Sequence, residues 1–235
     1  MKKLIFFSLC ILASISANAQ LVKSRTFAKK ESNTTWYTRF GLSVNNMAGN
    51  MSETPWANLN EIPSIGSSWG SAASYDITFG FQKPINRSDV YWGMDLGIGT
   101  RGFSHECYAQ GTSKLNEKLN SHNVKFSPVT FGYKHELFDQ FSIDIHVGGY
   151  FSYDFAGKLN RVFDGTNPLY EEESDQTIGN IEKYVRYDAG VAAGAGIWYN
   201  RFNLDFTYQR GFISVVEFDE DMYSSKFMIR LGVSF

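Results

Sequence analysis

The chain has 235 residues, enough for one domain or at most two small ones, and it carries 22 basic against 24 acidic side chains, a formal net charge of -2. A protein that binds nucleic acid would need a basic excess, so this balance argues against that class. Aromatic residues make up 16% of the chain, with 21 glycines and only 5 prolines, which favours a strand-rich fold over a helical or disordered one.

Residues 1–19 are predicted to be a secretory signal peptide. Two lysines precede the apolar stretch Leu4–Ile15, and Ala17 and Ala19 are the small residues that a signal peptidase reads. The apolar stretch is too short for a membrane-spanning helix. We expect cleavage after Ala19, which leaves Cys107 as the one cysteine and excludes an internal disulfide.

Residues 20–34 are predicted to form an N-terminal arm on the periplasmic side. Four basic residues lie in it, Lys23, Arg25, Lys29 and Lys30. An unstructured tail is the simpler interpretation, since chain termini are often poorly ordered. The alternative is a contact with a periplasmic partner or with anionic lipid headgroups.

From residue 35 to the end of the chain, apolar and polar side chains alternate with the period of two that is typical of β-strands. In one segment, for example, Ile143 and Ile145 alternate with Asp144 and His146. An α-helix would mix the two sets around its circumference, because its period is 3.6. The eight segments with this pattern are Thr35–Asn46, Ala72–Lys83, Asp89–Phe103, Asn123–Lys134, Phe141–Phe155, Tyr184–Tyr199, Phe202–Gly211 and Lys226–Phe235.

The fourth segment contains an irregularity. Its apolar phase shifts from Val124 and Phe126 to Val129 and Phe131, with Pro128 between them. Proline cannot donate to a strand ladder and is found at bulges. We therefore predict a β-bulge at Pro128.

Segment length favours a membrane barrel over a soluble sandwich. The segments run for about ten to sixteen residues, whereas ordinary strands have about 5–6 and strands of about 9–11 cross a bilayer. Aromatic residues are predicted to mark the two membrane–water interfaces. They are Trp36, Phe81, Trp92, Phe141, Tyr199, Phe202 and Phe235 at one rim and Tyr153, Phe155 and Tyr187 at the other.

Connections between the segments alternate in length, as in outer-membrane barrels. The short ones are Pro84–Ser88, His135–Gln140 and the turn at Asn200 and Arg201, and the long ones are Met47–Ser71, Ser104–His122, Ala156–Lys183 and Phe212–Ser225. We predict an all-β fold, an eight-stranded antiparallel up-and-down transmembrane β-barrel over residues 35–235. Both termini then lie on the short-turn, periplasmic side.

Eight strands enclose an interior that side chains just fill. The polar face carries both charge signs, and buried charges persist only when they are paired. We therefore predict a plug of ion pairs and hydrogen bonds, with Gly190, Gly194 and Gly196 making room for long neighbours. The inward set is Arg39, Arg101, Lys125, Arg186 and Arg230 with Asp76, Asp95, Asp144, Asp154, Asp188 and Asp205.

Two stretches resemble known outer-membrane proteins. The C-terminal KFMIRLGVSF, which ends in Phe235, resembles the C-terminal recognition signal of Gram-negative outer-membrane proteins. The stretch Tyr187–Phe212 resembles the penultimate hairpin of the outer membrane protein β-barrel domain family, the porin-like, PorT-like eight-stranded barrels. The resemblance covers roughly Trp36 to Phe235 and implies an integral outer-membrane location. It also implies links to protein secretion or envelope integrity in some members, and no catalytic motif.

Reactive groups are few. His146 shares a face with Asp144, Ser142 and Ser152, a set that a lipid-modifying hydrolase would use, but a polar filler in the lumen is the simpler interpretation. A metal site would have to use His105, Glu106, Cys107 and His122, whose spacing matches no regular ligand pattern. Glu171, Glu172, Glu173 and Asp175 suit a solvated acidic loop, or one bridged by divalent ions to lipopolysaccharide, better than a calcium site.

We accordingly expect no catalytic, cofactor or metal site, and a non-enzymatic outer-membrane protein with a structural, adaptor or secretion-associated role. The alternatives are a narrow porin or transporter for small solutes and, less favoured, a lipid-modifying enzyme. Expected partners are outer-membrane lipid and lipopolysaccharide, the barrel assembly machinery and envelope or secretion proteins, with no nucleic acid.

Overall fold

The computed structural model describes residues 33–49, 64–86, 88–109, 114–164, 173–181, 183–217 and 221–235. The predicted signal peptide, and the predicted arm up to residue 32, lie outside these ranges. No helix in these ranges is long and apolar enough to cross a membrane. Within them, the elements are β1 (Thr35–Gly49), β2 (Ser64–Gly70), β3 (Ala72–Pro84), β4 (Val90–Ala109), β5 (Lys114–Phe138), β6 (Phe141–Asp164), β7 (Glu173–Thr177), the 3-10 helix η3 (Ile178–Asn180), β8 (Tyr187–Tyr199), β9 (Phe202–Ser214) and β10 (Met222–Ser234).

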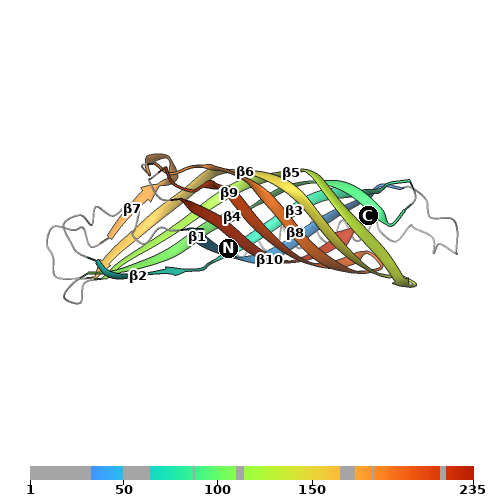
Figure 1. The fold of residues 1–235 in the computed structure, drawn as a ribbon, viewed down its shortest axis with the longest axis horizontal. Coiled ribbons are helices and arrows are strands. Elements are labelled where there is room, and N and C mark those ends of the chain that lie inside the picture. The colour runs from blue at the N-terminus through green and yellow to red at the C-terminus, as the bar shows by residue number, and fades with distance from the viewer. Residues whose placement is uncertain are drawn as a thin grey trace, which may run out of the picture.

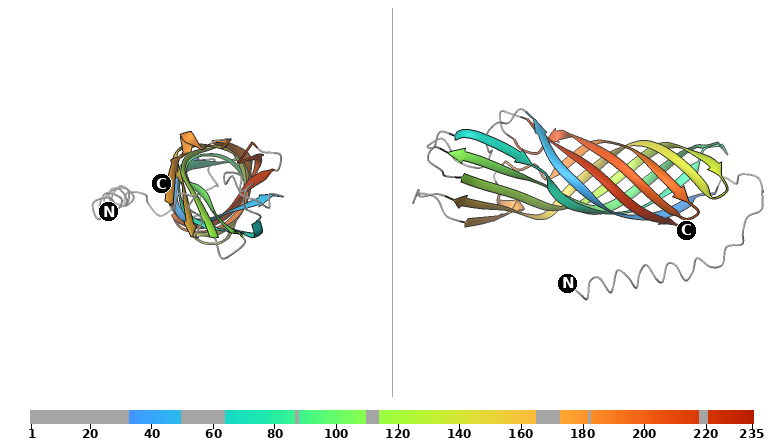
Figure 2. Two further views of the ribbon diagram at one scale, coloured as in Figure 1. Left: turned by 90° about the vertical axis from the view of Figure 1, so that its left-hand side faces the viewer. Right: turned by 90° about the horizontal axis from the view of Figure 1, so that it is seen from below.

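Eight of these strands form a closed antiparallel ring, seen end-on in Figure 2. The order around the ring is β1, β3, β4, β5, β6, β8, β9 and β10, and β10 pairs with β1 to close it. Each strand therefore pairs with the ring strand that follows it in sequence. This confirms the predicted eight-stranded up-and-down barrel.

The stagger of the ring can be followed through its paired residues. Moving from each residue to its partner on the next strand, and starting at Asn45 on β1, one returns to β1 at Thr35. Thr35 is ten residues before Asn45. A ring of eight strands with this stagger is narrow, and side chains fill its interior. The path runs Asn45, Lys226, Gln209, Ala192, Gly148, Thr130, Gly93, Gln82, Thr35.

Apolar side chains point outward from the ring and polar ones point into it. Ile145 is 63% exposed and Val191 is 42% exposed, whereas Asp144 and Arg230 are buried. The inside of the barrel is therefore polar and its outside is apolar, the reverse of a soluble sandwich. This is the arrangement that hydrocarbon solvation of the outer face requires.

An aromatic band follows the outer face where the turns are short. Trp36 packs against Phe81 with ring centroids 5.2 Å apart, and Phe81 packs against Trp92 at the same distance. Tyr199 and Phe202 continue the band as exposed residues. The predicted rim is thus continuous across β1, β3 and β4 and has further exposed members on β8 and β9.

The predicted bulge is present. Pairing of β5 with β6 shifts register between Phe126 and Val129, and pairing of β5 with β4 shifts between Gly93 and Asp95. Ser127 points inward while Val129 points outward, so the shift absorbs the change in apolar phase. Pro128 is the residue at which the phase changes.

The two ends of the barrel differ (Figure 1). At the short-turn end, the chain reverses within two residues at Asp139 and Gln140 and at Asn200 and Arg201. Gln140 and Asn200 have φ of 66° and 55°, left-handed values that asparagine tolerates well. At the other end, β4, β5 and β6 continue past the ring and are joined by β2 and β7. We call the continuation, with β2 and β7, the extended end.

The extended end corrects the predicted loops. Ser104–His122 is not a loop, because β4 runs to Ala109 and β5 starts at Lys114, and these stretches pair with each other. Most of the described part of Ala156–Lys183 is likewise strand. The predicted strand Tyr184–Tyr199 starts later, at Tyr187, because Val185 turns inward and is buried.

Candidate functional site

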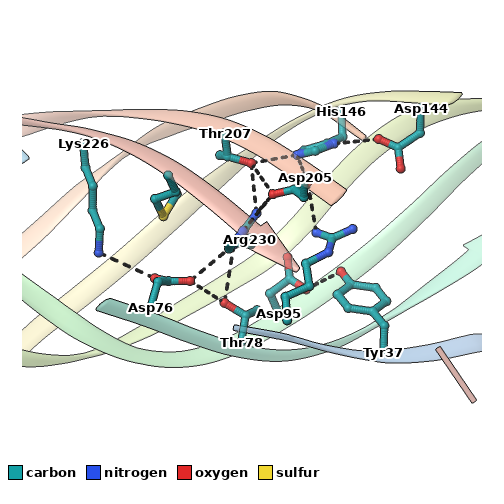
Figure 3. A network of polar contacts seen from close by, with 12 residues as sticks. Tyr37, Asp76, Thr78, Asp95, Asp144, His146, Asp205, Thr207, Lys226 and Arg230 are labelled. Carbon is teal, nitrogen blue, oxygen red and sulfur yellow. Dashed lines mark hydrogen bonds and ion pairs between the residues drawn. The ribbon is translucent and has the colours of Figure 1, made fainter. Parts of the chain in front are cut away.

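The lumen is the chemically richest part of the molecule, and Arg230 on β10 lies at its centre (Figure 3). Its Nε donates to Asp205 Oδ1 on β9 at 2.8 Å, and its NH1 lies 3.5 Å from Asp76 Oδ1 on β3, two strands away in the other direction. It also donates to the hydroxyls of Thr207 and Thr78. One guanidinium thus ties three strands together through charge-assisted hydrogen bonds.

Asp76 also contacts two lysines, one on β5 and one on β10. Lys125 Nζ lies 2.8 Å from Asp76 Oδ2, and Lys226 Nζ lies 3.6 Å from the same oxygen. Arg39 approaches Asp205 Oδ2 at 3.5 Å. All of these side chains are buried or nearly so, which confirms the predicted plug of ion pairs.

A second cluster lies closer to the extended end. Arg101 donates to Asp154 Oδ2 through Nε at 3.0 Å and through NH2, and its NH1 lies 3.7 Å from Asp188. Asp188 accepts hydrogen bonds from Tyr150 at 2.9 Å and Ser224 at 2.7 Å. The carboxylates of this cluster therefore share one guanidinium and several hydroxyls.

Arg186 was predicted to belong to the inward set, and this is wrong. It lies outside the barrel, over the ring of Tyr153 at 5.1 Å. Its Nε donates to the carbonyl oxygen of Asp154 at 3.0 Å. The reason is that Arg186 lies before the first residue of β8, so the alternation of side chains along that strand does not apply to it.

The histidine in the lumen contacts a threonine rather than a serine. His146 Nδ1 lies 3.0 Å from Asp144 Oδ1, and its Nε2 lies 3.2 Å from Thr207 Oγ1. Thr207 also donates to Asp205 at 2.9 Å, so its hydroxyl belongs to the Arg230 network. The structure gives Ser142 and Ser152 no hydrogen bond to His146 among the described residues.

The cavities beside these groups are small. His146 and Thr207 line a space of about 20 Å³, and Arg101 and Asp188 line another of about 20 Å³. Such spaces hold about one water molecule each. A substrate has no room next to the Asp144–His146–Thr207 arrangement.

Three of the four residues considered for a metal, His105, Glu106 and His122, point in different directions; the side chain of the fourth, Cys107, lies outside the described part of the structure. His105 points into the extended end, 3.6 Å from Glu117, whereas Glu106 points outward to Lys114 at 2.9 Å. His122 faces outward and lies 3.1 Å from the hydroxyl of Tyr75. The described residues contain no group of three His, Cys, Asp or Glu side chains close enough to share a metal.

The acidic segment is only partly described, since Glu171 and Glu172 lie outside the described residues. Asp175 lies on β7 and accepts hydrogen bonds from Asn160 at 2.9 Å and Lys158 at 3.3 Å. These hydrogen bonds lower the pKa of the Asp175 carboxyl below its ordinary value. Asp175 is therefore part of a surface pair on the outer side of the sheet.

An aromatic floor closes the lumen at the short-turn end. Tyr37, Tyr91 and Trp198 are buried, and the rings of Tyr37 and Trp198 meet edge-on at 6.3 Å. Lys134 Nζ lies over Trp198 at 3.6 Å from the far side of this floor. Below it is a recess of about 120 Å³, lined by Gln82 and Tyr91 among others, which faces out of the short-turn end.

A cluster of apolar side chains closes the lumen at the extended end. We call this cluster the apolar cap. Residues 183–185 pair with 215–217, through Val185 N to Val215 O at 2.9 Å and Glu217 N to Lys183 O at 3.0 Å. The buried members of the apolar cap are Met47, Phe103, Leu119, Leu159, Ile178, Ile181, Tyr184, Val215, Val216 and Met222.

Sequence reasoning missed the floor and the cap. Trp198 lies an even number of residues from Gly194 and Gly196, so the alternation along β8 already places it on the inward face. The two glycines are confirmed as space-makers. A Cβ on Gly194 would lie 2.5 Å from His146 Nε2, and one on Gly196 would lie 3.0 Å from Asp144 Oδ1.

A comparison with protein families agrees with this architecture. The family model described as "Outer membrane protein beta-barrel domain" matches residues 15–217. Among solved structures, the chain is similar to Ail, the attachment invasion locus protein of Yersinia pestis, at 12% identity and TM-score 0.40, covering 86% of this chain and 99% of that one. It is also similar to Neisserial surface protein A, at 14% identity and TM-score 0.38 over 85% and 97%, and to OprG of Pseudomonas aeruginosa, at 12% and 0.37 over 87% and 97%. No curated protein matches the chain.

Proposed function

The chain belongs to the outer membrane protein β-barrel domain family and is an integral outer-membrane protein, and from that premise we propose that it is a non-enzymatic scaffold that displays a folded β-sheet at the cell surface. Its role is then structural or adaptor-like, in envelope integrity or protein secretion. The lumen provides the anchor and the extended end provides the contact surface.

The observation that carries this proposal is that the lumen is closed while the extended end is built up. Ion pairs fill the middle of the barrel, and the aromatic floor and the apolar cap lie at its two ends. Meanwhile five strands, β2, β4, β5, β6 and β7, continue as a sheet beyond the ring. The two longest strands, β5 and β6, belong to the ring and also extend well beyond it. This extension supports a role at a surface rather than in conduction.

Orientation is the second part of the proposal. We place the short-turn end and both termini in the periplasm and the extended end outside the cell, as in barrels with short periplasmic turns. The C-terminal KFMIRLGVSF then lies where the barrel assembly machinery would bind it. Lipopolysaccharide surrounds the other rim.

Thiol labelling of intact cells tests the orientation. In a Cys107→Ser background, Asn120→Cys on the extended end is expected to react with a membrane-impermeant maleimide, because Asn120 is exposed. Lys83→Cys at the short-turn end is expected to react only after the outer membrane is permeabilised. The opposite pattern would overturn the orientation.

A deletion strain tests the role. We expect increased detergent sensitivity or reduced protein secretion, restored by the wild-type gene. Planar-bilayer recordings of the purified protein separate this role from the porin alternative, for which steady conductance is expected. A deletion strain with an unchanged envelope and unchanged secretion would refute the scaffold role.

A further inference from the structure

One arginine lies on the face of the barrel that is otherwise apolar. Arg210 on β9 pairs with Val191 on β8 and Ser225 on β10, and Val191 points outward. Its neighbours on the same face of β9, Tyr208 and Phe212, are 48% and 62% exposed. Arg210 therefore belongs to the surface that faces lipid.

The guanidinium of Arg210 is held on an aromatic ring. It lies over Tyr223 on β10 at 5.6 Å, and the hydroxyl of Tyr223 donates to Asp221 at 3.0 Å. Within the described residues the structure records no ion pair for Arg210. A positive charge on a lipid-facing surface is costly unless it reaches the interface or meets an anion.

Arg186, which directly precedes the neighbouring strand β8, repeats this arrangement. Its guanidinium lies over Tyr153 at 5.1 Å, and it donates to the carbonyl oxygens of Asp154 at 3.0 Å and Phe155 at 3.4 Å. Tyr153 and Phe155 are exposed and belong to the second aromatic rim. Both arginines thus lie toward the extended end, outside the barrel, each fixed by a tyrosine.

Two guanidinium groups in this setting suit one kind of ligand. Arginine presents a planar fork that matches phosphate oxygens, and it is less strongly hydrated than lysine, so it tolerates a partly apolar site. An aromatic ring beneath the fork orients it and keeps its outer edge toward the ligand. Lipids that carry phosphate are the anions available at a membrane rim.

We propose that the outer face of β6, β8, β9 and β10 toward the extended end binds the phosphate groups of a glycolipid of the outer leaflet, with Arg210 and Arg186 as the phosphate ligands and Tyr223 and Tyr153 as the residues that position them. This inference rests on the proposed orientation, because it places the extended end at the outer leaflet. It deepens the proposed role by naming the residues that hold the lipid at this rim.

The test uses the full mature chain refolded into phosphatidylcholine vesicles with or without bisphosphorylated lipid A. Lipid A retained after extraction into mild detergent is measured by mass spectrometry. We expect wild type to retain it and Arg210→Gln and Arg186→Gln each to lose at least five-fold, with the double variant losing more. Lys83→Gln, an exposed cation at the short-turn end, is the matched control and is expected to behave as wild type.

Two additional arms identify the ligand. Dephosphorylated lipid A is expected to be retained poorly by wild type, and inorganic phosphate is expected not to compete. Equal retention of lipid A by wild type and by the folded double variant would overturn the site, and so would loss in Lys83→Gln of the same size. Symmetric vesicles make this outcome independent of orientation, so failure of the labelling test and failure of the lipid site are distinguishable.

Discussion

The ring and the extended end share the strands β4, β5 and β6, but their polar and apolar faces are reversed. In the ring the inner face is polar, and in the extended end the inner face is largely apolar. Along β4, Asp95 points into the ring while Leu96 and Ile98 point out; beyond it, Phe103 points in while Glu106 points out. The backbone pattern does not change between the two regions, but the solvent outside does, from hydrocarbon to water. The point along a strand at which its outward side chains change from apolar to polar therefore marks the edge of the membrane.

The interiors of the two regions are held together by different forces. In the ring, buried ions such as Asp76 and Arg230 stabilise only as complete networks. In the apolar cap, the burial of side chains such as Leu119 and Leu159 is stabilising by itself and does not depend on a charged partner. Substitutions that remove one group should thus damage the ring more than the cap.

Removing the central guanidinium is the largest expected perturbation. Arg230→Ala leaves Asp205 with only Arg39 at 3.5 Å as a cation among the described side chains and His146 as a further neighbour. Loss of one partner of a buried pair costs about 3–5 kcal/mol. The measurement is urea unfolding of the refolded barrel in vesicles, followed by tryptophan fluorescence.

Lys83→Ala, an exposed cation on β3, provides the control for Arg230→Ala and is expected to stay within about 0.5 kcal/mol of wild type. If both variants unfolded at the same urea concentration, the network would not hold the ring together.

Shortening a side chain of the apolar cap should give a smaller, local effect. Leu119 is fully buried, and Leu→Ala at such a site costs about 2–5 kcal/mol. Since the cap lies beyond the ring, we expect Leu119→Ala to speed amide hydrogen exchange in residues 114–122 and leave exchange around Phe131 unchanged. Asn120→Ala on the opposite face serves as the control, and uniform acceleration along β5 would show that the two regions unfold as one.

Much of the ring was predictable from sequence, because its outer face is largely apolar. Alternation located all eight ring strands, and the phase change at Pro128 located the bulge. The extended end was missed because its polarity is inverted. In residues 114–122, Glu117 and Leu119 point inward while Lys118 and Asn120 point outward, a mixture that suggests a loop when a membrane strand is expected.

The sequence predicted which side chains of the candidate site point into the lumen, but not which of them contact one another. Parity assigns Asp76, Asp205 and Arg230 to the lumen, but their contacts depend on the stagger of ten residues around the ring. That stagger brings Thr207 rather than Ser142 to His146. Arg186 fails the parity rule because it precedes the first residue of β8, Tyr187.

Introducing one arginine on the outer face of the ring, and one on the outer face of the extended end, tests whether hydrocarbon covers the first face and water the second. Ile145 is 63% exposed on the ring, and an arginine at the midplane of a barrel costs about 2–4 kcal/mol. Ile145→Arg is expected to reduce the folded fraction, seen as loss of the heat-modifiable band on gels. Asn120→Arg on the extended end is expected to change stability by less than about 0.5 kcal/mol. Equal effects at both positions would mean that hydrocarbon does not cover Ile145.

The smallest expected effect concerns an exposed pair on the extended end. Glu106 accepts hydrogen bonds from Lys114 at 2.9 Å and Tyr108 at 3.0 Å, and these hold the pKa of its carboxyl below the ordinary value of 4.5. A carboxyl whose pKa is lowered in the folded state stabilises it above the ordinary pKa and loses that contribution as the pH falls through the lowered value. The contribution is therefore complete at pH 7 and declines only below about pH 4.5. Carboxyl ¹³C NMR titration is expected to show the pKa of Glu106 below 4.5 in wild type and closer to 4.5 in Lys114→Gln. An unchanged pKa in that variant would show that Lys114 does not stabilise the Glu106 carboxylate. The effect is the smallest of those predicted because water at the outer face of the hairpin screens this pair, whereas the charges in the lumen are buried.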